Sequence, residues 1–135
     1  KTEMNGSPRV RSVSMNYWLN GLKPSGTFAQ YRVYRKVSDI VRPPTSGLVV
    51  FIDEHEDTID DGKFMILPVT PTSYVLDMPA NKRHDGSYVL SFADGHMETW
   101  KLKEPGMRNW NVSKPRPSRH SQDWQRLSSA CTALK

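Results

Sequence analysis

An Asp-Gly pair between two segments of alternating apolar and polar residues is the feature that most constrains this chain. Asp94 and Gly95 separate residues 87–93 from residues 96–102. Asp-Gly can place both central residues of a type I′ turn at positive φ, and the twist of that turn suits antiparallel strands. The sequence therefore predicts a β-hairpin formed by these two segments.

A two-residue loop would also fix the register of the hairpin, because side chains alternate between the two faces of a strand. On this register Met97 shares the core face with Tyr88, Leu90 and Phe92, whereas Trp100 lies on the other, mixed face. The expected pairs are Ala93 with His96, Phe92 with Met97, Leu90 with Thr99, and Val89 with Trp100.

His84 and Asp94 do not form a catalytic dyad on this interpretation, although nine residues separate them. An extended strand between them, at about 3.3 Å per residue, holds the two side chains roughly 23 Å apart. His84, Asp94 and Gly95 are therefore expected to be a structural frame.

The same motif resembles a known family. A histidine, nine residues and Asp-Gly within FADGH are similar to the H-X9-DG segment of bacterial prepilin-type proteins, also called type II secretion protein G-like or pseudopilin-like. The acidic stretch 51–62 (FIDEHEDTIDDG) resembles a segment that precedes the hairpin in many members, and residues 11–16 and 123–127 are also similar to segments of the group. The resemblance runs from about residue 9 to residue 127.

This resemblance implies a non-enzymatic subunit of a type II secretion pseudopilus or type IV pilus-like filament, exported to an extracytoplasmic location. Members begin with a basic leader and an apolar stem helix of about 20 residues, whereas this sequence begins with polar residues at Lys1. Either the stem has been removed or the chain is a stand-alone relative, and contact with the membrane is expected only through a stem. Major pseudopilins are also known for a calcium site in a loop of the globular domain.

Composition and hydrophobic pattern predict one α+β domain, mainly an antiparallel β-sheet, over residues 1–135, with residues 1–8 and 105–120 loosely structured. Gly47 opens an apolar run that is typical of a central strand covered on both faces. Ser121 is expected to cap a C-terminal helix whose apolar stripe is Trp124, Leu127, Cys131 and Leu134. Beyond the hairpin, strands are expected within residues 10–19, 30–37, 47–52, 63–69 and 74–78.

The formal charge of +5 conceals three regions of different sign. Residues 1–46 carry eight basic and two acidic side chains, residues 47–78 carry one and seven, and residues 79–135 carry ten and five. Opposite charges on separate segments favour contacts between copies. We therefore expect pilin-like subunits to meet through the acidic loop of one copy and a basic segment of the next.

The acidic loop is the candidate metal site. Oxygen ligands crowded before a glycine suit Ca²⁺, which takes six to eight oxygens in flexible geometry, although the EF-hand pattern is absent and a solvated loop paired with arginines is the competing interpretation. Zinc is less favoured, because Ile59 stands where a zincin motif that starts at His55 needs its second histidine. The candidate calcium ligands are Asp53, Glu54, Asp57, Asp60 and Asp61.

The charge and the aromatic residues suggest two further functions. A pI near 9.5 and four tryptophans suggest nucleic-acid binding, but no recognition module accompanies the charge, and we expect no specific nucleic-acid partner. A stand-alone extracytoplasmic module that binds a glycan or a protein is the alternative, with Tyr17, Trp100 and Trp110 as a stacking surface. Cys131 is the single cysteine, which excludes an intramolecular disulfide.

Overall fold

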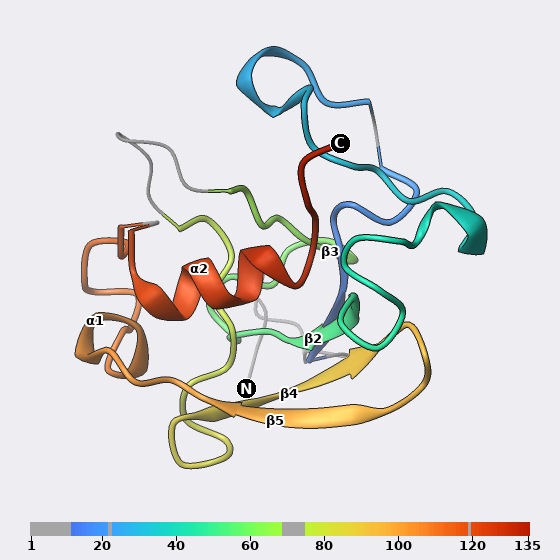
Figure 1. Ribbon diagram of the computed structural model, residues 1–135. Helices are drawn as coiled ribbons and strands as arrows, with labels where there is room; N and C mark the ends of the chain where they lie inside the picture. The colour runs from blue at the N-terminus through green and yellow to red at the C-terminus, as the bar shows by residue number, and fades with distance from the viewer. Residues whose placement is uncertain (1–11, 22, 69–74, 119) are drawn as a thin grey trace.

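The computed structural model describes residues 12–21, 23–68, 75–118 and 120–135, and shows a small α+β domain built on one five-stranded sheet (Figure 1). The strand order is β3-β1-β2-β4-β5. The strands are β1 (Val13–Asn16), β2 (Val49–Asp53), β3 (Lys63–Phe64), β4 (Ser87–Phe92) and β5 (Met97–Lys101). The helices are the 3₁₀ turns η1 (Gly26–Phe28) and η2 (Val37–Asp39), and the α-helices α1 (Pro105–Arg108) and α2 (Gln122–Ser129).

The α+β class is confirmed, but the sheet, which was predicted to be mainly antiparallel, is mixed. β1 runs parallel to β3, with Met15 opposite Lys63, while the other three pairings are antiparallel. After β2 the chain passes through the acidic segment, residues 53–61, and then forms β3 on the side of β1 that faces away from β2. Hydrophobic alternation specifies that a segment is extended but not which neighbour it pairs with, so β3 could not be placed from sequence.

The hairpin of β4 and β5 is present, but its turn is not type I′. That turn requires positive φ at both central residues, and the described non-glycine residues with positive φ are Asn20 and Asp85. Gly95 alone of the pair has positive φ, 92°, and its amide donates to the carbonyl of Phe92 at 2.9 Å. The loop therefore has three residues, a tight turn closed by a left-handed glycine.

The extra loop residue shifts the register by one, so the predicted pairs are wrong and β5 presents its faces the other way. Leu90 pairs with Glu98 and Tyr88 with Trp100. Trp100 is consequently buried on the core side, whereas Met97 is 66% exposed. A one-residue slip moves every side chain of a strand to the other face.

Helix α2 covers one face of the sheet (Figure 1). Trp124 and Leu127 are fully buried, and the Trp124 indole donates to the carbonyl of Leu67 at 3.0 Å. Cys131 is buried just beyond the helix, but Leu134, predicted to continue the stripe, lies outside it and is 54% exposed. Ser121 stands at the N-cap, where its hydroxyl donates to Glu104 instead of accepting a helix amide hydrogen.

Several expected elements are shorter than predicted or of another kind. Residues 30–37 are not a strand, and make only isolated bridges at Tyr31 and Tyr34. The described part of 74–78 is not a strand either, and residues 1–8 lie outside the described residues. Within 105–120, expected to be loosely structured, α1 forms and the side chains of Met107 and Trp110 are buried.

β2 is central, as predicted, but the described residues cover only one of its faces well. Ile52 is fully buried, whereas Phe51, whose side chain lies on the opposite face, is 47% exposed. The cross-strand neighbours of Phe51 are Met15 and Ser91, so all three side chains share this open face. Among the described residues, no helix combines the length and apolarity that crossing a bilayer requires.

Candidate functional site

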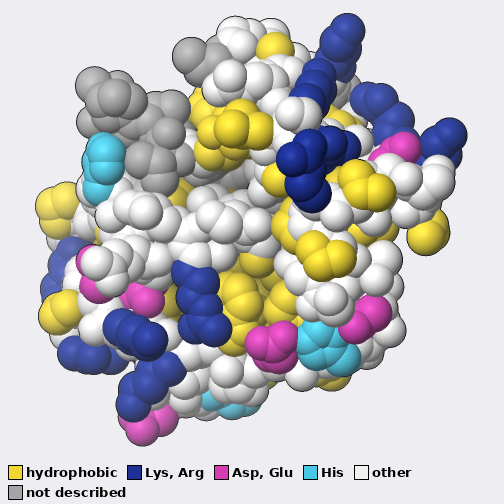
Figure 2. Space-filling model, viewed as in Figure 1, with side chains coloured by type: hydrophobic (Ala, Val, Ile, Leu, Met, Phe, Trp, Pro, Cys, Tyr) yellow, Lys and Arg dark blue, Asp and Glu magenta, His cyan; other side chains and the backbone are white. Residues whose placement is uncertain are grey.

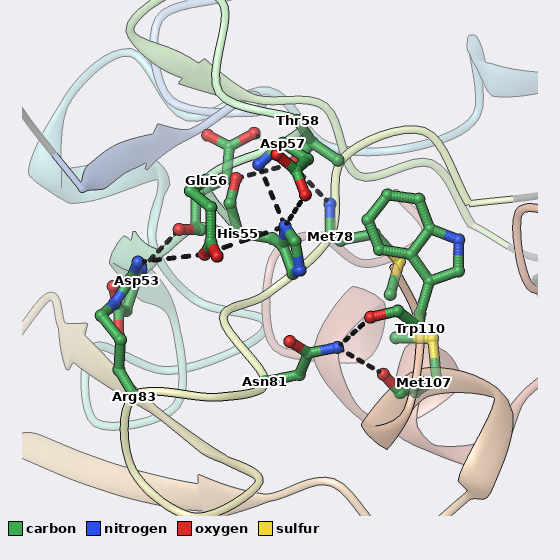
Figure 3. Close-up of polar contacts among 11 residues, drawn as sticks. Asp53, His55, Glu56, Asp57, Thr58, Met78, Asn81, Arg83, Met107 and Trp110 are labelled. Atoms are coloured by element: carbon green, nitrogen blue, oxygen red, sulfur yellow. Dashed lines mark hydrogen bonds and ion pairs between the residues drawn. The ribbon is translucent and has the colours of Figure 1, made fainter. Parts of the chain in front are cut away.

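The acidic segment begins where β2 ends, and its first carboxylate belongs to an ion-pair cluster (Figure 3). Asp53 Oδ1 lies 2.5 Å from the Arg83 guanidinium, and the same guanidinium contacts Glu56 Oε2 at 3.4 Å. Arg83 also donates to the backbone carbonyl of Glu54 at 2.6 Å. His84 adds an imidazole contact, its Nε2 lying 3.8 Å from Asp53 Oδ2. Asp53, at the end of β2, is therefore engaged with Arg83 and His84, which precede β4.

Glu54 points to the opposite side and is fully buried. Its carboxyl group accepts hydrogen bonds from the hydroxyls of Ser14 and Thr58, the latter at 3.0 Å. Burial raises the pKa of Glu54 to about 8, and the nearby Asp77 charge adds to the increase, although the two hydroxyls oppose it. At neutral pH this group is largely protonated and hydrogen-bonded, which removes it as an anionic ligand for a hard cation.

His55 organises the turn that follows. Its Nδ1 accepts the backbone amide hydrogen of Asp57 at 3.0 Å, and its buried ring packs edge-on against Trp110 with the centroids 4.9 Å apart. Carboxylate oxygens of Glu56 and Asp57 each lie 3.9 Å from Nδ1. Among the described residues these three form the one set whose metal-ligand atoms lie within 4.8 Å of one another. Because Nδ1 already accepts a backbone hydrogen bond, a metal ion bound through Nδ1 would have to displace that bond.

Asp60 and Asp61 lie farther along, exposed at the mouth of a groove of about 520 Å³. Asp57 and Asp77 also line this groove, and we call it the acidic groove. Burial raises the pKa of Asp77 to about 6, opposed by the hydrogen bond that the Met65 amide donates to its carboxylate at 2.6 Å. The apolar walls of the groove come from Tyr17, Ile59, Met65 and Leu76.

The five predicted calcium ligands are therefore divided among three environments, and as a set they do not fit a single ion. Asp53 is in the Arg83 cluster and Glu54 is buried beneath the hydroxyls, while Asp57, Asp60 and Asp61 line the acidic groove. The pattern of acidic residues could not reveal this division, because it depends on which residues Ser14, Asp77 and Arg83 approach in three dimensions.

The motif residues His84 and Asp94 lie at opposite ends of β4, and each is engaged locally. Asp94 contacts His96, whose other ring nitrogen lies 2.6 Å from Glu98. The hydrogen bonds to these two carboxylates raise the pKa of His96, Glu98 contributing most. The His96 ring also stacks on Phe92, with centroids 4.4 Å apart. Asp94 and His96 thus organise the hairpin tip, whereas His84 contacts Asp53 at the other end of β4.

The open face of the sheet carries a second groove, of about 440 Å³. Its apolar lining includes Val13, Phe51 and Met97, which are 44%, 47% and 66% exposed. Asp53 and His84 from the ion-pair cluster close one end. The tryptophans expected for a stacking surface, Trp100 and Trp110, are both buried and do not line this groove. The Arg126 guanidinium covers Trp100, with its Cζ 3.8 Å from the centroid of the ring.

No protein family model, curated protein or solved structure matches this chain.

Proposed function

We propose that this chain is the globular part of a non-enzymatic, pilin-like subunit that assembles with other pilin-like subunits outside the cytoplasm. The family assignment rests on the sequence resemblance described above. The structural observation that carries the proposal is the open face of the sheet. A β-sheet normally buries each apolar face against another layer, and here α2 covers one face while Phe51 and Met97 stand exposed on the other.

An exposed apolar surface that is hollowed and edged by charges is typical of a protein–protein contact. Val13, Phe51 and Met97 come from β1, β2 and β5, so the apolar surface spans the sheet. The Asp53–Arg83 pair at one end supplies the polar edge. A neighbouring subunit seated on this face would provide the missing layer.

Several side chains that could act in catalysis are buried or in contact with carboxylates, which supports a binding role over an enzymatic one. The Ser14 hydroxyl donates to Glu54, but both groups are buried where a substrate could not reach them. Cys131 is also buried, and burial raises the pKa of its thiol well above the usual range, which suppresses the nucleophilic thiolate. His84 and His96 contact carboxylates, and among the described residues no serine, threonine or cysteine side chain forms a hydrogen bond with either imidazole ring.

The test is self-association of the chain with Phe51 replaced by lysine. Fully burying a large apolar side chain contributes about 1.5–3 kcal/mol, and Phe51 is 47% exposed, so Phe51→Lys is expected to weaken association by roughly 3- to 10-fold. Sedimentation velocity over a range of protein concentrations measures this change. Val112→Lys is the matched control, because Val112 is 69% exposed and lies outside the open face. Equal weakening by both variants, or by neither, would overturn the proposal.

A further inference from the structure

We propose that a basic lobe of one copy, residues 32–42, docks in the acidic groove of a second copy, so that copies associate head to tail. This inference rests on the proposed function and names the surfaces through which neighbouring subunits meet. The observations that carry it are the charge, exposure and apolar content of the two surfaces.

The lobe combines positive charge with exposed apolar side chains. Residues 32–42 contain four arginines and lysines but one carboxylate, Asp39. That carboxylate accepts the backbone amide hydrogens of Arg35 and Lys36 at 2.9 and 3.1 Å, which fixes the turn at η2. Val37 is 77% exposed and Val41 is 58% exposed. Figure 2 shows Lys and Arg side chains gathered with hydrophobic ones at the upper right, where Figure 1 draws this part of the chain.

The lobe is held in a defined position rather than left to move as a tail. The buried Tyr34 side chain lies near the start of the lobe, and its hydroxyl donates to the carbonyl of Arg42 at the end, so the two ends are held together. The Tyr34 amide donates to the carbonyl of Trp18 at 2.9 Å. A surface fixed in this way loses little conformational freedom when a partner binds.

The acidic groove offers the complementary surface. Four carboxylates line it against two cations, Lys63 and Arg116. Arg116 is already engaged, since its guanidinium donates to the carbonyl of Leu76 and lies 5.0 Å from the centroid of the Trp110 ring. The volume of about 520 Å³ falls within the roughly 300–1,000 Å³ that is usual for ligand pockets. The groove therefore has the sign, the apolar walls and the size to accept Val37 together with a neighbouring cation.

The lobe and the groove are separate surfaces of one chain, because no residue of 32–42 lines the groove. A contact between two different surfaces is heterologous, and it leaves one free lobe and one free groove at the ends of each complex. Such a contact can repeat along a filament. An individual ion pair at a surface contributes little binding free energy. Many such weak contacts, acting together along a filament, would stabilise the assembly.

The experiment uses two variants that each reverse one surface: Asp60→Lys with Asp61→Lys in the groove, and Arg35→Glu with Lys36→Glu in the lobe. At an ionic strength of about 0.01 M, where charges act over about 30 Å, each variant alone is expected to self-associate at least tenfold more weakly than wild type. An equimolar mixture of the two variants is expected to recover association, because each reversed surface then meets its opposite. Sedimentation velocity of each variant and of the mixture measures this.

Two further variants control for folding and for net charge. Asp60→Asn with Asp61→Asn keeps the side-chain oxygens that accept the amide hydrogens of Asp61 and Lys63, both at 2.8 Å, and is expected to weaken association without loss of structure. Lys82→Glu with Lys101→Glu makes the same charge change as the lobe variant on exposed residues outside both surfaces, and is expected to associate as wild type does.

The outcomes separate this inference from the proposed function. If wild type associates and Phe51→Lys weakens it, but the mixture of reversed variants recovers nothing, the docking of lobe in groove is overturned while the subunit function stands. Wild type that stays monomeric at every concentration and salt level would overturn both.

Discussion

Replacing Glu54 by glutamine tests the electrostatics of the buried carboxyl group at the start of the acidic segment. Glutamine keeps the size of the side chain and can exchange hydrogen bonds with the hydroxyls of Ser14 and Thr58, since a hydroxyl donates or accepts. It cannot ionise. Any difference between the two proteins that depends on pH therefore reports the cost of charging Glu54 in its buried position.

The size of the effect follows from the change in pKa on folding. The pKa of Glu54 is about 8 in the folded chain, against 4.5 for the unperturbed group. Between these values the folded protein retains a proton that the unfolded chain releases, so stability falls as the pH rises from about 4.5 to about 8. Each pKa unit corresponds to 1.36 kcal/mol, which gives a loss of about 3 kcal/mol between pH 4.5 and pH 7. Glu54→Gln is expected to avoid this loss.

Urea denaturation of both proteins at several values between pH 4.5 and pH 8.5 measures the difference in free energy of unfolding. The Asp77 carboxyl, whose pKa is raised to about 6, titrates in both proteins, so its contribution largely cancels in the difference. Asp85→Asn serves as the control, because Asp85 is an exposed carboxylate outside this cluster. A difference between Glu54→Gln and wild type that stays constant across the range would refute the reasoning, because Glu54 would then titrate alike in the folded and unfolded chains.

Three other predictions concern the hairpin, the cysteine and calcium. Gly95→Ala is expected to lower the free energy of unfolding, measured by urea denaturation, by about 1 kcal/mol. The cause is backbone conformation and not a clash, because Gly95 has a φ of 92° and a Cβ built there would meet no atom within 4 Å. An unchanged free energy of unfolding would contradict the three-residue loop. Cys131 is expected to resist a thiol reagent in the folded protein and to react at the rate of unfolding, since its thiol is buried and its pKa is raised by burial; rapid labelling without denaturant would contradict that burial. Millimolar Ca²⁺ is expected to leave the thermal midpoint of unfolding unchanged, because the five predicted ligands are divided among three environments; a rise in midpoint that a chelator reverses would show that the ion draws the carboxylates together.

The hairpin shows how far local chemistry determines this fold. Alternation from Tyr88 to Phe92 and the following Asp-Gly pair were sufficient to locate both strands. The turn type was not determined locally, because the loop is bonded to a distant segment: the Ala93 amide donates to the carbonyl of Leu48, and the Asp94 amide donates to that of Thr45. These hydrogen bonds accompany the three-residue loop, and the sequence of the hairpin alone does not predict them.

The candidate site was predictable in composition but not in chemistry. The sequence placed six carboxylates between Asp53 and Asp61, and this number suggested a common ligand. Their different roles come from tertiary partners: Arg83 neutralises Asp53, and Ser14 from β1 helps to enclose Glu54. Burial of Glu54 is the decisive difference, because it turns a ligand of hard cations into a neutral, hydrogen-bonded core group.

The apolar surface on the open face of the sheet depends on the register between β4 and β5. Had β5 followed the predicted register, Met97 would lie in the core and Trp100 would stand exposed. The one-residue shift reverses both, so that Met97 joins Phe51 and Val13 on the open face while Trp100 fills the core beside Tyr88. Trp100 is thereby withdrawn from the stacking surface that was expected for a glycan-binding module, and Met97 extends the apolar surface of the open face. The turn at Gly95 thus determines which side chains of β5 lie on the open face and which lie in the core.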